Sequence, residues 1–249
     1  MERLDSITAF FPAFNDGGTI ASMVISALIT LPKVTNDFEV IVINDGSKDY
    51  TGEILDELAR IYPEVKIINH GTNKGYGSAL RSGFGSSSKS WIFYTDGDAQ
   101  YDPRELVKLV RAVSPDTDIV NGYKISRSDP LHRILIGRLY HHIVRVLFGF
   151  KLKDVDCDFR LISREVLEKV QLDSTSGTIC LEMVKKFQDA GFRFKEVGVH
   201  HFHRAYGKSQ FFNFRRLLRT GVQLLSLWWD LVLKKRIFRL RSQEGTLRP

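Results

Sequence analysis

The sequence predicts an α/β fold in which a mostly parallel sheet is flanked by helices. Short apolar runs alternate with segments of helical spacing through the first half of the chain, which is the pattern of parallel strands joined by crossover helices. Clusters of Gly, Asn and Asp follow three of the apolar runs, and sheets of this kind bind ligands at the carboxyl ends of their strands. The 249 residues, 43% of them hydrophobic, are enough for one large domain.

The first half supplies most of the expected sheet. Strands are expected in the apolar runs at 7–13, 38–44, 65–69, 91–95 and 119–122. Helical spacing between these runs predicts helices at 19–31, 50–61, 75–85 and 103–113, and Pro103 suits a first helical turn.

The second half begins with a basic amphipathic segment, 130–149, which predicts one long helix. After it we expect a strand at 159–163, helices at 164–170 and 179–190, a strand at 194–200 and a loop at 203–210. Because no repeat or Pro- or Ser-rich linker interrupts the chain, residues 1–211 are predicted to form one domain, followed by a basic amphipathic extension at 212–249.

Positive charge is concentrated near the C-terminus. The net charge is +7, and nine Lys and Arg residues after position 212 face only Asp230 and Glu244. Such an excess favours an anionic partner: nucleic acid, a phospholipid surface or a phosphorylated substrate. The apolar segment 222–233 is too short to span a bilayer, for which about 20 residues are needed. It predicts either an interfacial helix on anionic lipid or a helix packed on the domain.

Other features narrow the class of protein. The only cysteines, Cys157 and Cys180, form no disulfide framework, and the first residues lack the apolar core of a signal peptide, so the cytosol is the expected compartment. No nucleic-acid-binding module is present, which disfavours nucleic acid as the partner. The Gly75-Tyr-Gly77 segment has Leu80 where a dinucleotide-binding fingerprint needs Gly or Ala, and no phosphate-binding Gly-Lys-Ser loop is complete.

Two carboxylates, Asp96 and Asp98, follow the apolar run at 91–95. Mg²⁺ is commonly held by one or two carboxylates together with substrate phosphates, so this pair is a candidate metal site. Taken alone, an Asp-Gly dipeptide is also a common turn.

Four motifs in order carry a family resemblance. They are Pro12-Ala-Phe-Asn-Asp16, Asn44-Asp-Gly-Ser-Lys-Asp-Tyr-Thr51, Asn73-Lys-Gly-Tyr-Gly-Ser-Ala79 and Thr95-Asp-Gly-Asp-Ala-Gln100. With them the chain resembles the family 2 glycosyltransferases of the GT-A fold, a Rossmann-like nucleotide-diphospho-sugar transferase fold. Within that family it is most similar to polyprenyl-phosphate sugar synthases of the dolichol-phosphate mannose synthase type, over roughly residues 7 to 210.

The resemblance assigns a donor site to the first half, about 1–122. It places the nucleotide sugar against Pro12, Ala13, Phe14, Asp16, Asp45, Gly75, Gly77 and Asp96. Asp16 stands where the family commonly has Glu, and Gly75 and Gly77 either let the backbone approach the ligand or serve a tight turn. The resemblance also implies that Asp96, Asp98 and Gln100 hold Mg²⁺ or Mn²⁺ against the donor diphosphate, where the metal neutralises the leaving group.

The acceptor half, about 123–211, is expected to need cations. A phosphomonoester carries about −1.5 to −2 charges near neutral pH and is already an anionic nucleophile. The resemblance assigns its binding to Lys124, Arg133, Arg204 and Lys208.

One segment departs from the synthases. Where they usually read like Asp-x-Thr-Ser-Gly-Phe-Arg, this chain has Asp154-Val-Asp-Cys-Asp-Phe-Arg160. Asp156 and Asp158 are candidates for a general base acting on a hydroxyl acceptor, or for structural partners of Arg160. In the first case the acceptor is a saccharide hydroxyl.

The sequence therefore predicts a metal-dependent, inverting glycosyltransferase. It would move a sugar from a GDP- or UDP-sugar to a polyprenyl phosphate, dolichyl or undecaprenyl, at the cytoplasmic face of a membrane, held there peripherally or by a membrane-protein partner. Two other classes stay open: a phosphatase or nucleotide hydrolase using the same carboxylates, for which Gln100 is not the expected residue, and a basic binding protein without catalysis.

Overall fold

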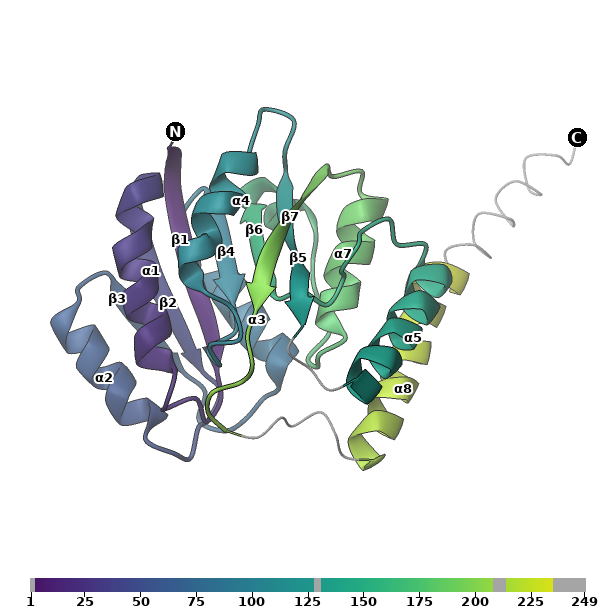
Figure 1. The fold of residues 1–249 in the computed structure, drawn as a ribbon, viewed down its shortest axis with the longest axis horizontal. Helices are drawn as coiled ribbons and strands as arrows, with labels where there is room; N and C mark the ends of the chain where they lie inside the picture. Colours follow the sequence, from purple (N-terminus) through teal and green to yellow (C-terminus); the bar gives the residue numbers. More distant parts are fainter. Residues whose placement is uncertain (1–2, 128–130, 208–213, 235–249) are drawn as a thin grey trace, which may run out of the picture.

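The computed structural model describes residues 3–127, 131–207 and 214–234, of which 126, 127, 131–139 and 214–219 are described by backbone alone. Seven strands form one sheet in the order β3-β2-β1-β4-β6-β5-β7, with helices on both faces (Figure 1). The mostly parallel α/β fold predicted from the sequence is confirmed.

The elements follow one another along the chain. The strands are β1 (Leu4–Ala13), β2 (Thr35–Asn44), β3 (Val65–Asn69), β4 (Trp91–Thr95), β5 (Ile119–Arg127), β6 (Phe159–Ser163) and β7 (Phe194–His201). The helices are α1 (Ile20–Val34), α2 (Thr51–Ile61), α3 (Tyr76–Ser86), η1 (Pro103–Glu105), α4 (Leu106–Ala112), α5 (Leu131–Phe148), α6 (Arg164–Lys169), α7 (Ile179–Asp189), α8 (Phe214–Trp228) and the π-helical turn η2 (Trp229–Leu233).

Strands β3, β2, β1 and β4 run parallel, so their carboxyl ends lie at one edge of the sheet. The exception to the parallel arrangement is β6, which pairs antiparallel with both β4 and β5, while β5 and β7 are parallel. The ends of β1 and β2 are in register, with Ala13 opposite Asn44. The polar clusters that follow these strands are therefore neighbours in space.

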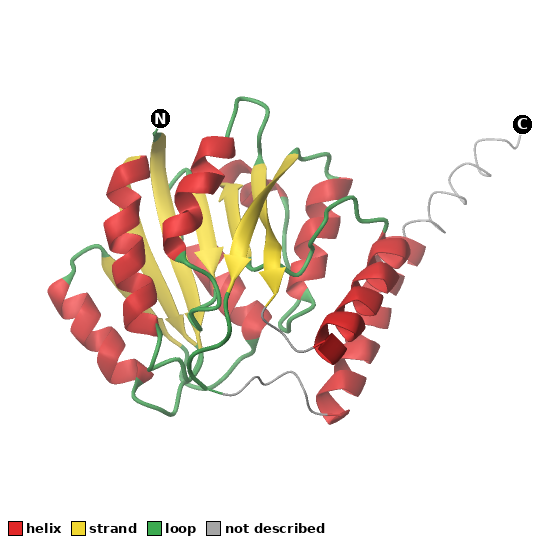
Figure 2. Ribbon diagram, viewed as in Figure 1, coloured by secondary structure: helices red, strands yellow, loops and turns green. Residues whose placement is uncertain are grey.

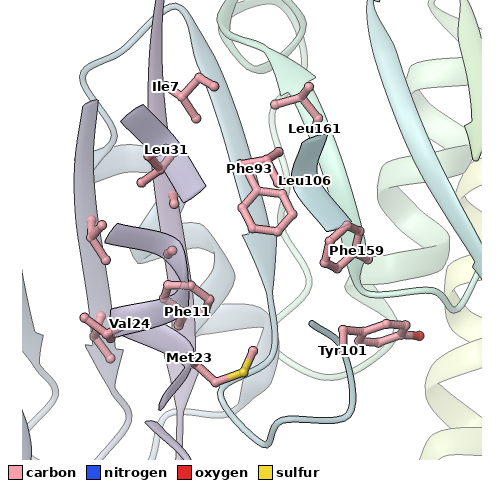
Figure 3. Close-up of a cluster of buried hydrophobic side chains, with 14 of the residues drawn as sticks. Ile7, Phe11, Met23, Val24, Leu31, Phe93, Tyr101, Leu106, Phe159 and Leu161 are labelled. Atoms are coloured by element: carbon pink, nitrogen blue, oxygen red, sulfur yellow. The ribbon is translucent and has the colours of Figure 1, made fainter. Parts of the chain in front are cut away.

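Alternating side chains of β1 fill the core on both faces of the sheet, as the pleat of a strand requires. Ile7, Ala9 and Phe11 pack with apolar residues of α1, α2 and α4 on one face, and Figure 3 shows part of this cluster. Phe10 points to the other face, where α3, α6 and α7 pack. Figure 2 shows helices on both sides of the sheet. Strands covered on both faces read as continuous apolar runs, which is why the sequence indicated them clearly.

Helices α5 and α8 lie beside each other next to α7 (Figure 1). Val144 and Phe148 of α5 pack with Leu224 and Leu227 of α8, and the indole of Trp228 donates to the Leu147 carbonyl at 2.9 Å. One face of the C-terminal segment is therefore packed on the domain. Of the described helices, none combines the length and the apolar character that crossing a membrane requires.

The predicted strands and helices are all present, with differences at their ends. Strand β5 continues to Arg127, five residues past the expected end, because β7 pairs with it as far as Arg127, with an irregularity between Lys124 and Ser126. Helix α1 runs through Pro32 to Val34, since both Leu31 and Val34 are buried against the sheet. Helix α8 begins at Phe214, before the apolar segment that predicted it.

Candidate functional site

The carboxyl ends of β1, β2 and β4 bring three polar segments together. The Asp45 amide donates to the Ala13 carbonyl at 2.9 Å, which joins the ends of β2 and β1. The Gly97 amide donates to the Pro12 carbonyl at 3.2 Å, and the Thr19 hydroxyl donates to the Gly97 carbonyl at 2.8 Å. Pro12 and Ala13 are buried and Phe14 is half-buried. The structure therefore brings together the three polar clusters that the sequence places after apolar runs.

Asp16 lies buried in the loop after β1. Its Oδ2 accepts the Phe14 amide at 3.0 Å, and its own amide donates to the Thr51 hydroxyl at 3.0 Å. Burial, aided by repulsion from Asp98 and opposed by the Phe14 hydrogen bond, raises the pKa of Asp16 from 3.8 to about 6. The ionised form of the Asp16 carboxyl is therefore disfavoured in the folded protein.

Asp96 and Asp98 follow β4, and different groups hold them. The Tyr76 hydroxyl donates to Oδ1 of Asp96 at 2.7 Å. The backbone amide of Gln100 donates to Oδ1 of Asp98 at 3.0 Å, and Ala99, which lies between these two residues, has a φ of 58°. Burial, followed by repulsion from Asp158 and Asp98, holds the pKa of Asp96 well above 3.8. Several carboxylates thus crowd this end of β4.

Arg204 lies among these carboxylates. Its guanidinium pairs with Oδ2 of Asp98, and Nη1 is 4.0 Å from Oδ1 of Asp16. The resemblance assigned Arg204 to the acceptor phosphate together with Lys124, but in the structure it contacts Asp98 and Asp16, which the resemblance assigned to the metal and the donor. The neighbouring Tyr206 ring lies over Gly18, where an added Cβ would come within 2.4 Å of it. The segment after β7 therefore crosses the loop after β1.

Gly75 and Gly77 begin α3, and both are closely approached by backbone of this chain. Gly75 has a φ of +96°, and a Cβ there would lie 2.6 Å from the Thr175 carbonyl oxygen. The Gly77 amide donates to the same oxygen at 3.0 Å. The close approach that these glycines permit is thus to the loop before α7.

Asp45 is almost fully buried, and its carboxylate holds the segment before α3. Oδ1 accepts the Lys74 amide and Oδ2 accepts the Gly75 amide, both at 2.9 Å. His70 Nδ1 lies 2.6 Å from Oδ1. Sequence reasoning missed His70 and Tyr76; Tyr76 stands between two noted glycines, but nothing in the sequence showed that its hydroxyl reaches Asp96.

The Asp154–Arg160 segment forms a second polar cluster. Nζ of Lys124 is 3.8 Å from Oδ2 of Asp154 and donates to the Asp156 carbonyl at 3.4 Å. Burial opposes the charge of Lys124, yet attraction to Asp154 and its neighbours raises the lysine's pKa. Burial and Asp154 raise the pKa of Asp156 to about 6. Asp158 accepts from the Cys180 thiol at 3.1 Å.

Arg160 lies beneath this cluster and is 1% exposed. It donates to Asn121 Oδ1 at 2.6 Å, to the Tyr94 hydroxyl at 3.0 Å and to the Val155 carbonyl. Its hydrogen bonds therefore go to these groups and not to Asp156 or Asp158. Of the other predicted acceptor-phosphate residues, Lys208 lies outside the described residues and Arg133 belongs to the part of α5 described by backbone alone.

The oxygen donors fit a hard divalent cation. Asp96 and Asp98 supply carboxylates, which Mg²⁺ and Mn²⁺ prefer, and the Tyr76 bond uses only one oxygen of Asp96. Gln100 lies beside them, with its Nε2 donating to the Phe202 carbonyl at 3.3 Å. No group of three or more His, Cys, Asp or Glu side chains that could hold a metal forms within the described part of the chain. Two carboxylates are sufficient where substrate phosphates complete the shell.

The protein has the GT-A fold of the nucleotide-diphospho-sugar transferases. This class is defined here by the strand order of the sheet, by the helices on both of its faces and by the Asp-Gly-Asp segment after the fourth strand. Residues 8–171 match the family described as Glycosyl transferase family 2, and the chain belongs to that family. It is therefore a glycosyltransferase, and the predicted family and enzyme class are confirmed.

Two relatives extend the match over almost the whole chain. The glycosyltransferase AglD of Haloferax volcanii is 31% identical over 242 residues, which are 94% of this chain and 38% of that protein. The undecaprenyl-phosphate 4-deoxy-4-formamido-L-arabinose transferase of Yersinia enterocolitica is 26% identical over 250 residues, 99% of this chain and 73% of that one. The chain thus spans well under half the length of AglD.

Among solved structures, glucosyl-3-phosphoglycerate synthase from Mycobacterium tuberculosis has a similar fold. Its complex with Mn²⁺, uridine diphosphate and glucosyl-3-phosphoglycerate aligns with a TM-score of 0.68, covering 91% of this chain and 79% of that one. Because the sequences are only 17% identical, this likeness concerns the fold.

Proposed function

We propose that this glycosyltransferase moves a sugar from a nucleoside diphosphate sugar to a polyprenyl phosphate, with inversion at the sugar, and that Asp96 and Asp98 bind a divalent cation. The observation that carries the proposal is the crowding of Asp16, Asp96 and Asp98 at the carboxyl ends of β1 and β4. Burial and mutual repulsion raise the pKa of Asp16 and of Asp96 even with Arg204 nearby. Such a site favours a ligand that brings positive charge.

Each residue type then has a task. A bound cation supplies charge neutralisation for the departing nucleoside diphosphate. Asp96 and Asp98, with Gln100 beside them, hold it at the end of β4. Pro12 and Ala13 at the end of β1 and Phe14 just after it, together with Asp16 and Asp45, form the wall for the nucleotide. Gly75 and Gly77 shape the start of α3 that borders it.

The acceptor is proposed to bind beside the second polar cluster. Lys124 offers a cation there, and Arg133 and Lys208 belong to the segments assigned to the same role. Arg204 stands at the junction, because its charge lies against Asp98 and Asp16. A polyprenyl phosphate acceptor is supported by the similarity to the Yersinia relative, which is an undecaprenyl-phosphate transferase.

An exposed apolar surface supports a membrane location. Large apolar side chains remain exposed on the outer side of α5 and of the α8–η2 segment: Ile143, Val146, Val222, Leu225 and Trp229. Their exposed fractions run from 44% to 69%. With the basic C-terminal sequence, this surface suits the cytoplasmic face of an anionic membrane. Flotation with anionic vesicles, reduced in Trp229→Ser and absent with neutral vesicles, is the expected result.

The deciding assay offers the purified protein UDP- and GDP-sugars with polyprenyl phosphate, with Mn²⁺ or with EDTA, and measures labelled glycolipid. We expect metal-dependent transfer that Asp98→Asn abolishes. Asp102→Asn is the matched control, because Asp102 lies on the same loop and pairs with Arg104. Transfer that persists in EDTA would refute the metal role, and hydrolysis without transfer would indicate a hydrolase.

A saccharide hydroxyl is the second candidate acceptor. The pKa of Asp156 is about 6, close to the range in which a general base works at neutral pH. A lipid phosphate needs no such base. Transfer to sugar alcohols, with none to polyprenyl phosphate, would favour this alternative.

A further inference from the structure

His70 is a buried histidine, 7% exposed, whose two ring nitrogens both contact neighbouring segments. Nδ1 lies 2.6 Å from Oδ1 of Asp45, and Nε2 lies 2.9 Å from the Ser82 hydroxyl. A carboxylate can only accept, so Nδ1 donates to Asp45, and Nε2 is within hydrogen-bonding distance of the Ser82 hydroxyl. The ring therefore links the end of β3, the loop after β2 and helix α3.

The Asp45 carboxylate in turn holds the segment that precedes α3. Besides His70 it accepts the amides of Lys74 and Gly75, each at 2.9 Å, and it is 3% exposed. Three donors thus converge on one buried carboxylate, which leaves about one of its roughly four acceptor sites. Asp45 acts first of all as the anchor of the segment that precedes α3.

That segment ends on Tyr76, whose hydroxyl donates to Oδ1 of Asp96 at 2.7 Å. Gly75, immediately before it, has a φ of +96°, a conformation that glycine adopts readily, although glycine also has many alternatives. The Asp45 bonds to the Lys74 and Gly75 amides fix the chain in this one. Ser82, His70 and Asp45 are thus joined by side-chain contacts, Asp45 holds the Lys74 and Gly75 amides, and the next residue, Tyr76, reaches Asp96.

We propose that His70 is a positioning residue for the donor site: it orients Asp45, which fixes the 74–76 segment so that the Tyr76 hydroxyl holds Asp96 in the geometry for a divalent cation. This role rests on the proposed function, because it assumes that Asp96 helps to bind the cation. Partners that hydrogen-bond to a metal ligand set the ligand's orientation, and losing one weakens metal affinity typically about 10- to 100-fold.

The proposal distinguishes two replacements of His70. In His70→Leu the apolar side chain fills the space but donates nothing, so Asp45 loses one of its three donors. In His70→Asn the amide nitrogen can take the place of Nδ1, and the bond to Asp45 is kept while that to Ser82 is lost. Rescue by Asn but not by Leu is expected of a positioning hydrogen bond and not of simple packing.

The test measures Mn²⁺ affinity by electron paramagnetic resonance in the presence of UDP, and separately of GDP. The variants are His70→Leu, His70→Asn, Tyr76→Phe and the double variant that combines His70→Leu with Tyr76→Phe. We expect Tyr76→Phe to weaken Mn²⁺ binding about 10- to 100-fold, and His70→Leu to weaken it by about tenfold. If His70 acts through Tyr76, adding His70→Leu to Tyr76→Phe weakens binding no further.

Hydrogen exchange at the Lys74 and Gly75 amides gives a readout that needs no metal. We expect faster exchange at both in His70→Leu and wild-type rates in His70→Asn. Glu39→Gln is the matched control, since Glu39 is also buried and is bonded to Thr8, Lys66 and Ser88 in the middle of β1 and β2, away from their carboxyl ends.

The outcomes separate the two claims. Additive losses in the double variant, unchanged exchange in His70→Leu, or an equal loss of Mn²⁺ affinity in Glu39→Gln would overturn the role of His70 while leaving the proposed function standing. No binding of Mn²⁺ by the wild-type protein with either nucleotide would refute the proposed function, and the role of His70 with it.

Discussion

Replacing Asp16 with asparagine is expected to stabilise the metal-free protein at neutral pH. Asp16 is 6% exposed, and burial is the largest cause of its raised pKa, with repulsion from Asp98 adding to it. Asparagine keeps an oxygen that can accept the Phe14 amide, as Asp16 does at 3.0 Å. The substitution removes a negative charge whose burial opposes folding.

The size of the effect follows from the pKa. Folding raises the pKa of Asp16 from 3.8 to about 6, so the folded protein binds the proton more tightly than the unfolded chain. Stability is then lost as the pH rises through this window, and the loss is complete above it. A rise of a little over two pKa units, at about 1.36 kcal/mol each, corresponds to roughly 3 kcal/mol. Asp16→Asn should recover up to that amount near pH 7 and nothing near pH 3.

The assay is urea unfolding in EDTA at a series of pH values, for wild type and Asp16→Asn. The difference in unfolding free energy should grow between pH 4 and pH 6 and then stay level. Asp102→Asn should behave oppositely: although burial opposes its charge, the Arg104 contacts lower the pKa of Asp102, so this carboxylate favours folding above its pKa. A variant at position 16 that is less stable than wild type at pH 7 would refute the reasoning.

Three further substitutions test other parts of the site. Gly75→Ala puts a Cβ 2.6 Å from the Thr175 carbonyl at a φ of +96° and should cost about 1–3 kcal/mol in unfolding free energy, whereas Gly85→Ala, in open space on α3, should be neutral or stabilising. Arg160→Met leaves three buried acceptors without their donor and should lower the unfolding free energy by about 3–5 kcal/mol; a smaller loss would mean that the cluster repacks. Asp158→Asn should leave kcat with polyprenyl phosphate nearly unchanged, and a fall of about 10²-fold or more would identify a general base instead.

The strands and the position of Asp96 and Asp98 at the edge of the sheet could be predicted because their signals are local. The run at 91–95 reads as a strand because β4 is covered on both faces, and Asp96 and Asp98 follow it directly in the sequence. The parallel order of β2, β1 and β4 then brings their carboxyl ends together without further information. For this part of the site, position in the chain is enough.

Long-range contacts could not be predicted in the same way. Arg204 is 106 residues from Asp98, and nothing in either segment indicates that they pair. The contacts of the Tyr76 hydroxyl with Asp96 and of the His70 ring with Ser82 depend on how α3 packs against β1 and β2. The sequence therefore indicated which residues lie at the edge of the sheet, but not which side chains form hydrogen bonds and ion pairs with them.

The position of Arg204 bears on how the two halves of the enzyme work together. It follows β7, in the half assigned to the acceptor, yet its guanidinium contacts Asp98 and lies near Asp16. One positive charge is shared there between Asp98 and Asp16, and the pKa of Asp16 stays raised in its presence. A divalent cation with a nucleoside diphosphate would change this balance in two ways, because the metal competes for Asp98 while the phosphates attract the guanidinium. A nucleoside diphosphate bound with the metal would thereby draw Arg204 from Asp98 and Asp16 towards the phosphates, and the rest of the segment 203–207 would move with it.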